Sequence, residues 1–229
     1  MHTSFDKGSQ TPQIYDLISV AFVAFLLISN IAATKLIGLN VGITTLIFDG
    51  GAILFPFTYI LGDVLSEVYG FRKAKRTILL GFVLSILASV IFLVVGALPP
   101  ADGYDQQAAF VAVLGFVPRI VLASVLGYLA GQLLNAWVLV RIKQRWGEDH
   151  LWARLIGSTL VGELADTIIF CTIAFYGVIT GAEFLNYVVV GYFYKVAVEI
   201  IALPLTYPTI AVVKRIEAGH RFREVNSRA

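Results

Sequence analysis

The sequence predicts an all-α polytopic membrane protein, and three observations support this fold class. Of the 229 residues, 58% are hydrophobic and 14% are charged, and the mean hydropathy is +0.83, outside the usual range of soluble domains. Six apolar runs are long enough to span a bilayer, which takes about 20 helical residues. The runs are continuously apolar rather than alternating, which argues against a transmembrane β-barrel.

The expected spans are, in order, Tyr15 to Leu36, Leu46 to Tyr69, Thr77 to Leu98, Val117 to Val140, Leu155 to Ile179 and Leu185 to Val213. We expect one six-helix transmembrane bundle over residues 1–229, with short tails at 1–14 and 214–229. Two sets of three spans would cross the membrane in opposite senses, so a 3+3 inverted-topology arrangement is open. Gly62-Asp63 and Gly162-Glu163 echo each other, but at different depths in their spans.

Basic residues indicate how the spans are oriented. Lys and Arg concentrate in residues 7, 72–76, 141–154 and 214–228, whereas the connections at 99–105 and 180–183 have none. Because short cytoplasmic segments are enriched in Lys and Arg, both termini are expected in the cytoplasm. The first run is too long for a cleavable signal peptide. The basic residues are dispersed over short segments, so no nucleic-acid partner is expected; the lipid bilayer is.

Six ionisable side chains lie inside the apolar runs: Asp63, Glu67, Glu163, Asp166, Lys195 and Glu199. Each costs roughly 2.5 to 3.5 kcal/mol at the centre of a membrane helix on insertion scales. They must therefore face one another, water or a ligand. Five acids cannot all pair with one base, so the set predicts a polar pathway or a substrate-binding cavity.

Helical spacing places aromatic residues beside these charges. Tyr59 precedes Asp63 by one turn, Phe170 follows Asp166 by one turn, and Tyr192 precedes Lys195. Asn30, in the first span, could support the external mouth of the same pathway. A carboxylate can accept two parallel N–H bonds from a guanine-like edge while a ring stacks on Tyr or Phe. The combination favours a flat ligand that is rich in hydrogen-bond donors.

Simpler roles for some of these residues stay open. Lys195 and Glu199 could form an i,i+4 ion pair without any ligand, and Glu67 could extend toward the basic residues that follow its span. Asp63 and Glu163 could be protonated carboxyls buried by packing. Gly127 and Gly131 form a G-x-x-x-G motif that favours helix packing inside the bundle over a homo-oligomer.

Several enzyme classes lack their residues. The chain has no Walker A motif, and its three histidines, at positions 2, 150 and 220, lie outside the spans without metal-ligand spacing. Leu61-Gly62-Asp63 lacks the first glycine of the G-x-G-D motif of intramembrane aspartyl proteases. We therefore expect no catalytic residue, no cofactor and no metal.

Four strings together resemble the queuosine precursor transporter family, also called the vitamin uptake transporter family. They are Ser29-Asn30-Ile31, Gly62-Asp63-Val64-Leu65-Ser66-Glu67-Val68-Tyr69-Gly70, Gly162-Glu163-Leu164-Ala165-Asp166-Thr167, and Tyr194-Lys195 followed by Glu199 and Pro204. The resemblance covers most of the chain. It implies a bacterial inner-membrane importer of 7-cyano-7-deazaguanine or 7-aminomethyl-7-deazaguanine, working as a secondary transporter or facilitator. A substrate-binding subunit of an energy-coupling-factor importer and an intramembrane enzyme are the alternatives.

Overall fold

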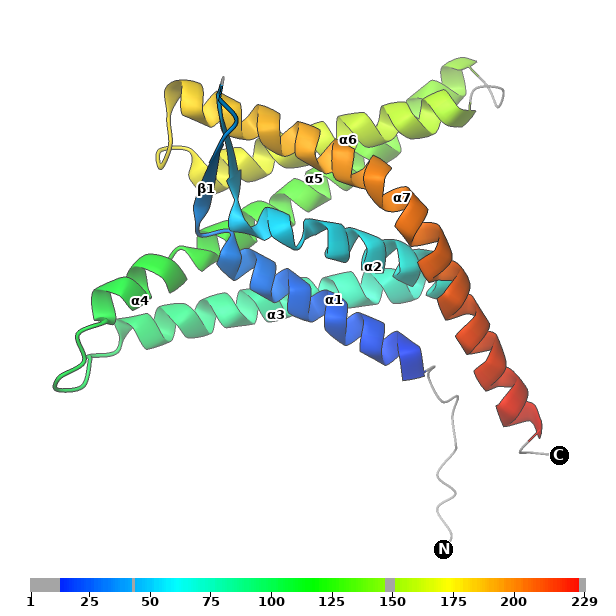
Figure 1. The fold of residues 1–229 in the computed structure, drawn as a ribbon, viewed down its shortest axis with the longest axis horizontal. Coiled ribbons are helices and arrows are strands. Elements are labelled where there is room, and N and C mark those ends of the chain that lie inside the picture. Colours follow the sequence, from blue (N-terminus) through cyan, green and yellow to red (C-terminus); the bar gives the residue numbers. More distant parts are fainter. Residues whose placement is uncertain (1–12, 43, 147–150, 227–229) are drawn as a thin grey trace, which may run out of the picture.

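The computed structural model describes residues 13–42, 44–146 and 151–226, and these are mostly helical (Figure 1). In chain order the elements are α1 (Gln13–Ala32), β1 (Leu36–Asn40), β2 (Thr45–Asp49), the 3₁₀ helix η1 (Gly50–Ile53), α2 (Phe55–Tyr69), α3 (Phe71–Ala97), α4 (Gln107–Leu114), α5 (Val117–Trp146), α6 (Leu151–Phe175) and α7 (Gly181–Asn226). Within the described residues, five helical stretches are long and apolar enough to cross a membrane. The prediction of a multi-pass helical membrane protein is confirmed at this level.

The second predicted span is not one continuous helix, and this corrects the sequence-based boundary. Thr45–Asp49 pairs with β1 as an antiparallel hairpin, in which Leu36 lies opposite Asp49. The Asp49 carboxylate then caps η1 by accepting a hydrogen bond from the Gly51 amide at 2.9 Å. Helix α2 follows, with 15 residues and a length of about 22 Å. Because it is shorter than a usual span, α2 is not among the five candidate membrane-spanning helices.

The connections lie at two ends of the molecule. The hairpin and the α3–α4 and α6–α7 connections lie at the left of Figure 1, while the α2–α3 junction and the start of α6 lie at the right. The α2–α3 junction is Gly70, whose φ of 81° lies in the left-handed region that favours glycine. The α2–α3 junction and the start of α6, both near segments in which the sequence concentrates basic residues, are therefore at the same end.

Helices α5 and α6 pack closely against each other at their glycine residues. A Cβ atom added at Gly131 would lie 2.9 Å from the carbonyl oxygen of Gly162, and one added at Gly127 would lie 2.8 Å from Oδ1 of Asp166. Both glycines of the G-x-x-x-G motif are buried. The structure thus shows the predicted packing inside the bundle, and a homo-oligomer through these two glycines stays a prediction.

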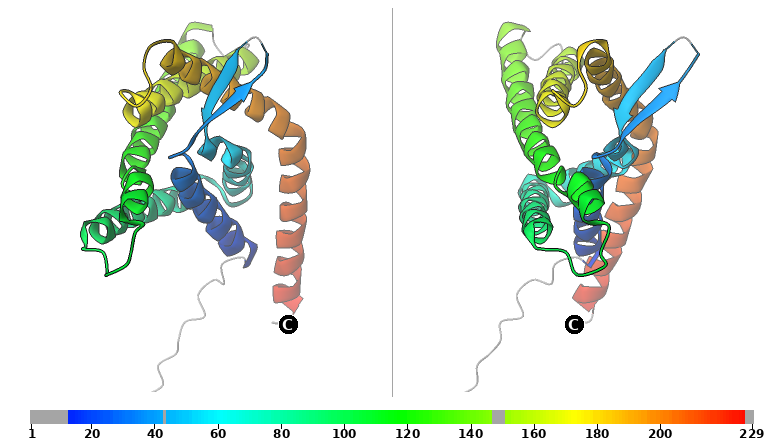
Figure 2. Two further views of the ribbon diagram at one scale, coloured as in Figure 1. Left: turned by 60° about the vertical axis from the view of Figure 1, so that its left-hand side comes forward. Right: turned by 90° about the vertical axis from the view of Figure 1, so that its left-hand side faces the viewer.

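Two hydrophobic cores lie on either side of the molecule, and α7 contributes to both. One core surrounds Val64 and Leu65 of α2 and includes Val213 of α7. The other surrounds Phe175 of α6 and includes Tyr187 of α7. Between these two regions the ribbon of α7 bends, and Pro204 and Pro208 lie inside the helix (Figures 1 and 2).

The end of α7 corrects the predicted start of the C-terminal tail. Helix α7 continues to Asn226, so the segment predicted as a C-terminal tail from residue 214 is helical over most of its length. Residues 1–12 of the N-terminal tail and 227–229 of the C-terminal tail lie outside the described residues, as do His2 and His150.

Candidate functional site

Three helices bring five of the predicted ionisable residues together. Glu163 and Asp166 are one turn apart on α6, Lys195 and Glu199 are one turn apart on α7, and Asp63 lies on α2. Positions three or four residues apart share a face of a helix, which explains why each pair points toward the neighbouring helix. We call Asp63, Glu163, Asp166, Lys195 and Glu199 the central cluster. It contains four carboxyl groups and one ammonium group.

Lys195 connects α7 to α6. Its ammonium nitrogen donates a hydrogen bond to Oδ2 of Asp166 and lies 4.0 Å from Oε2 of Glu163. The exposed fractions of the three side chains are only 18%, 22% and 23% for Lys195, Asp166 and Glu163. Lys195 therefore pairs across the helix boundary with two α6 carboxylates, in contrast to the i,i+4 pair with Glu199 that its spacing also allowed.

Two further carboxyl groups adjoin this pair. The side chains of Glu163 and Glu199 lie within hydrogen-bonding reach of each other, and the charge of Asp63 acts on Glu199. Tyr59 of α2 is near enough to sense the charges of Asp63, Glu163 and Glu199. Oε2 of Glu163 is buried and accepts no hydrogen bond. The central cluster thus holds an unused acceptor, as expected of a site whose remaining donors come from a ligand.

Phe55 lies beside the central cluster, and the sequence analysis missed it. The Lys195 ammonium lies 5.7 Å from the centroid of its ring, and this ring lies 6.2 Å from that of Tyr59. Phe55 precedes Tyr59 by four residues and Asp63 by eight, so it extends the same helical stripe. Continuing the stripe by one turn toward the N-terminus of α2 would have identified it.

Glu67 is not part of the central cluster. Its carboxylate lies 3.6 Å from the ammonium of Lys214, near the end of α2, and the exposed fraction of the Glu67 side chain is 64%. The neighbouring Tyr69 donates a hydrogen bond of 2.9 Å to Glu217 of α7. These contacts join the C-terminal part of α7 to α2, away from Lys195.

Phe170, Tyr192 and Asn30 make ring and hydrogen-bond contacts with residues outside the central cluster. The Phe170 ring packs against Phe175 in a hydrophobic core, and the Tyr192 hydroxyl donates to the Leu160 carbonyl at 3.4 Å. Asn30 is buried, where it donates to Ser85 at 3.2 Å and accepts from Ser124 at 3.1 Å. This last network joins α1, α3 and α5, so it explains the polar residue of α1 without any ligand.

The β-hairpin and η1 fasten the N-terminal part of α7 next to Lys195. The hydroxyl of Tyr187 donates to Asp49 at 2.7 Å, and that of Tyr194 donates to the Ala52 carbonyl at 2.7 Å. The Ile47 amide donates to the Asn186 side chain at 3.0 Å. Sequence reasoning missed these contacts because nothing in the local pattern pairs residues so far apart in the chain. These hydrogen bonds fix the position along the helix axis, and the rotation about it, of the turn of α7 that carries Lys195.

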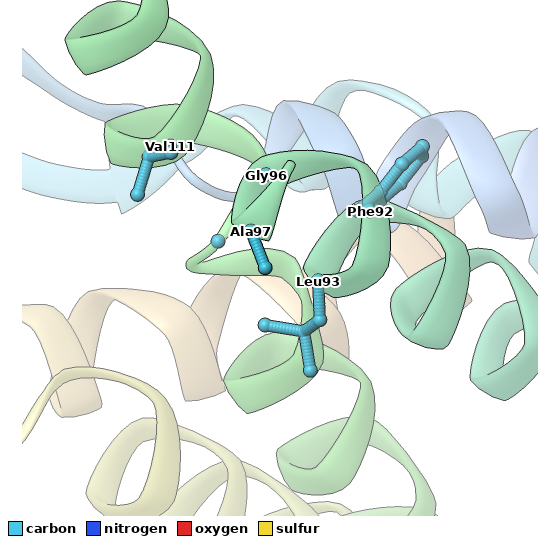
Figure 3. Close-up of a pocket in the computed structure, with 6 residues that line it drawn as sticks. Phe92, Leu93, Gly96, Ala97 and Val111 are labelled. Atoms are coloured by element: carbon cyan, nitrogen blue, oxygen red, sulfur yellow. The ribbon is translucent and has the colours of Figure 1, made fainter. Parts of the chain in front are cut away.

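A separate hollow of about 250 Å³ lies between the end of α3 and helix α4 (Figure 3). Its lining is apolar and consists of Phe92, Leu93, Gly96, Ala97, Val111 and Gly115. It has no polar side chain to orient a ligand, so it is a poor candidate for the site. Among residues 13–42, 44–146 and 151–226, no group of three or more His, Cys, Asp or Glu side chains is arranged to hold a metal ion.

Comparison with known proteins agrees with a transport protein. Residues 49–209 match the family described as "Putative vitamin uptake transporter". A "Probable queuosine precursor transporter" of Bacillus subtilis (strain 168) is 35% identical over 160 residues, which cover 69% of each chain. The "Queuosine precursor transporter" of Escherichia coli (strain K12) is 29% identical over 198 residues, covering 84% of this chain and 85% of that one. No solved structure gives a significant match.

The matched region runs from Asp49, at the end of the hairpin, to Thr209 of α7, and so contains the whole central cluster. Both the extent of the match and the similarity to the Bacillus subtilis protein lead to the same assignment: this chain belongs to the vitamin uptake transporter family.

Proposed function

We propose that this protein imports 7-cyano-7-deazaguanine, 7-aminomethyl-7-deazaguanine or both across the bacterial inner membrane, as a secondary transporter or facilitator. The observation that carries the proposal is the central cluster, which gathers four carboxyl groups and one ammonium group from α2, α6 and α7, with the ammonium beside two of the carboxylates. The names of the Bacillus subtilis and Escherichia coli relatives support the substrate class.

The chemistry of the site suits a deazaguanine. The guanine-like edge carries an N–H and an amine side by side, and one carboxylate can accept both in parallel. Glu163 provides an acceptor atom without a partner, and Phe55 and Tyr59 provide ring surfaces next to it. The aminomethyl form adds a cation, which the surplus of carboxylates would also accommodate.

The proposed topology has both termini in the cytoplasm. In this arrangement η1 and α2 form a short sixth crossing, and the hairpin lies on the external side. The distribution of Lys and Arg supports this orientation, because the junction after α2 and the connection after α5 are basic, whereas residues 99–105 and 180–183 at the other end have no Lys or Arg. Substrate would reach the central cluster from each side in turn by alternating access.

Uptake of radiolabelled precursor tests the proposal. Cells that cannot synthesise the precursor should accumulate the label when they produce this protein, and proteoliposomes containing the purified chain alone should do the same. Uptake in proteoliposomes would also show that no ATPase partner is required. A membrane-inserted protein that neither binds nor transports either deazaguanine would refute the proposal.

Analogues test which part of the substrate is recognised. A deazapurine without the exocyclic amine should compete poorly, because it leaves a buried acceptor unpaired at a cost of about 1 to 3 kcal/mol. Equal competition by this analogue and the intact precursor would mean that ring stacking or shape, rather than the carboxylates, governs recognition.

A further inference from the structure

We propose that Lys195 is a tethered cation that balances part of the carboxylate charge of the empty site, at Asp166 and Glu163, and is displaced from these α6 carboxylates when substrate binds. This inference rests on the proposed function and assigns to Lys195 a specific step of the transport cycle. It predicts that the protein can return empty across the membrane, so that net uptake needs no exchange against internal substrate.

The Lys195 ammonium makes the contacts expected of a substrate amine. It donates a hydrogen bond to Asp166, lies 4.0 Å from the unpartnered Oε2 of Glu163, and lies 5.7 Å from the centroid of the Phe55 ring. Carboxylates and an aromatic face are the groups that would bind the donors and the ring of a deazaguanine. Lys195 and the substrate therefore use the same acceptors.

Asp166 is packed tightly against α5, whereas Lys195 reaches it through a long side chain. A Cβ atom at Gly127 of α5 would lie 2.8 Å from Oδ1 of Asp166 and 3.0 Å from its backbone oxygen, so α5 packs directly against this residue. Lys195 reaches α6 from a neighbouring helix through a four-carbon stem with several rotatable bonds. When substrate donors arrive, the Lys195 ammonium is the group that can withdraw.

The groups that face Asp166 and Glu163 differ between the empty and the loaded site. With Lys195 in place, the empty site keeps a cation beside Asp166 and Glu163, and in the loaded site substrate donors serve the same acceptors. Without Lys195 the empty site would hold buried carboxylates with no cation, which strongly disfavours any state in which they are cut off from water. The return of the empty transporter should then become slow, whereas exchange of internal for external substrate avoids that step.

The test separates net uptake from exchange in proteoliposomes containing the purified full chain. Net uptake is measured with labelled 7-aminomethyl-7-deazaguanine outside empty vesicles, and exchange with unlabelled precursor inside. For Lys195→Gln we expect net uptake to fall about tenfold or more relative to exchange. Binding of the precursor to the purified variant should be equal to or tighter than binding to the parent, because the competing cation is gone.

Two variants make the result specific. Lys195→Arg keeps the cation, so its ratio of net uptake to exchange should stay close to that of the parent. Lys214→Gln removes an exposed lysine that lies on α7, like Lys195, and pairs with Glu67 of α2. This variant should retain both net uptake and exchange. The inference is overturned if Lys195→Gln lowers net uptake and exchange by the same factor, or changes neither. A parent that fails to bind and transport the precursor would instead refute the proposed function itself.

Discussion

Helix α7 forms two sets of ion pairs with its neighbours, and they differ sharply in their surroundings. Lys195 pairs with Asp166 and Glu163 of α6, and the exposed fractions of these three side chains are 18%, 22% and 23%. Lys214 pairs with Glu67 of α2, and the corresponding fractions are 52% and 64%. Both sets pair a lysine with carboxylates. A charged residue inside an apolar run is therefore not enough to identify the candidate site. Burial and neighbouring carboxyl groups distinguish the site from an anchoring contact.

The energetic contrast follows from this difference in exposure. An exposed ion pair contributes about 0 to 1 kcal/mol, because water already stabilises both charges. Removing one partner of a buried pair costs about 3 to 5 kcal/mol, because the other charge is left without compensation. Substitutions at the two places should consequently separate in stability and in transport.

The largest effect on stability is expected for Asp166→Ala. This change leaves the Lys195 ammonium with only the more distant Glu163, and we expect the free energy of unfolding in detergent to fall by about 3 to 5 kcal/mol. Glu67→Ala, the matched change in the exposed pair, should lower it by about 1 kcal/mol or less. The double variant with Lys195→Gln should recover part of the loss, since no unpaired ammonium remains. A similar loss for Asp166→Ala and Glu67→Ala would contradict the comparison.

Gly127→Ala should have the next largest effect, because it presses on the buried pair from the other side. The added methyl group would lie 2.8 Å from Oδ1 of Asp166, and we expect a loss of stability of about 1 to 3 kcal/mol together with reduced precursor uptake. Gly81→Ala is the control, since the one atom at the same distance from its methyl group is the end of the flexible Leu26 side chain, and Val23 and Phe22 lie at 3.8 and 3.9 Å. Thermal unfolding and uptake at matched abundance measure both changes. Full uptake by Gly127→Ala would show that the position of Asp166 is not critical.

Phe55→Leu should have a smaller effect that appears in binding rather than in folding. Loss of the ring removes a stacking surface for the ring of the substrate, which contributes about 0.5 to 1.5 kcal/mol. We expect precursor affinity to fall by about threefold to tenfold in equilibrium binding to the purified protein. Phe116→Leu, a change to a ring that packs against Phe175 in a hydrophobic core, should leave that affinity unaltered. An equal loss of affinity in the two variants would remove Phe55 from the site.

The central cluster was predictable from sequence because lipid makes isolated charges costly. Asp63, Glu163, Asp166, Lys195 and Glu199 stood out inside apolar runs, and the structure brings them together. The pattern did not show which helix each side chain would face. Phe170 and Tyr192 share faces with charged residues in projection, yet one packs in a core and the other meets the backbone of α6.

The hairpin could not be distinguished by hydrophobicity alone. Leu46, Ile47 and Phe48 are apolar and suit a buried strand as well as a membrane helix, so periodicity left the two alternatives equal. The deciding interactions are distant in sequence, such as the hydrogen bond from the Ile47 amide to Asn186. Asp49 followed by two glycines was a local signal for a chain break, and its capping of η1 explains why α2 begins later than expected.

The most direct test of the account compares Glu163→Gln with Glu67→Gln in uptake of labelled precursor at matched membrane abundance. Glu163 belongs to the buried central cluster, and loss of one charge-assisted hydrogen bond should weaken affinity by roughly 1.5 to 3 kcal/mol, or about 10- to 150-fold. Glu67 is exposed and pairs with Lys214, so its variant should transport nearly as well as the parent. Equal impairment of the two variants, or full uptake by Glu163→Gln, would contradict the assignment of the central cluster as the substrate site.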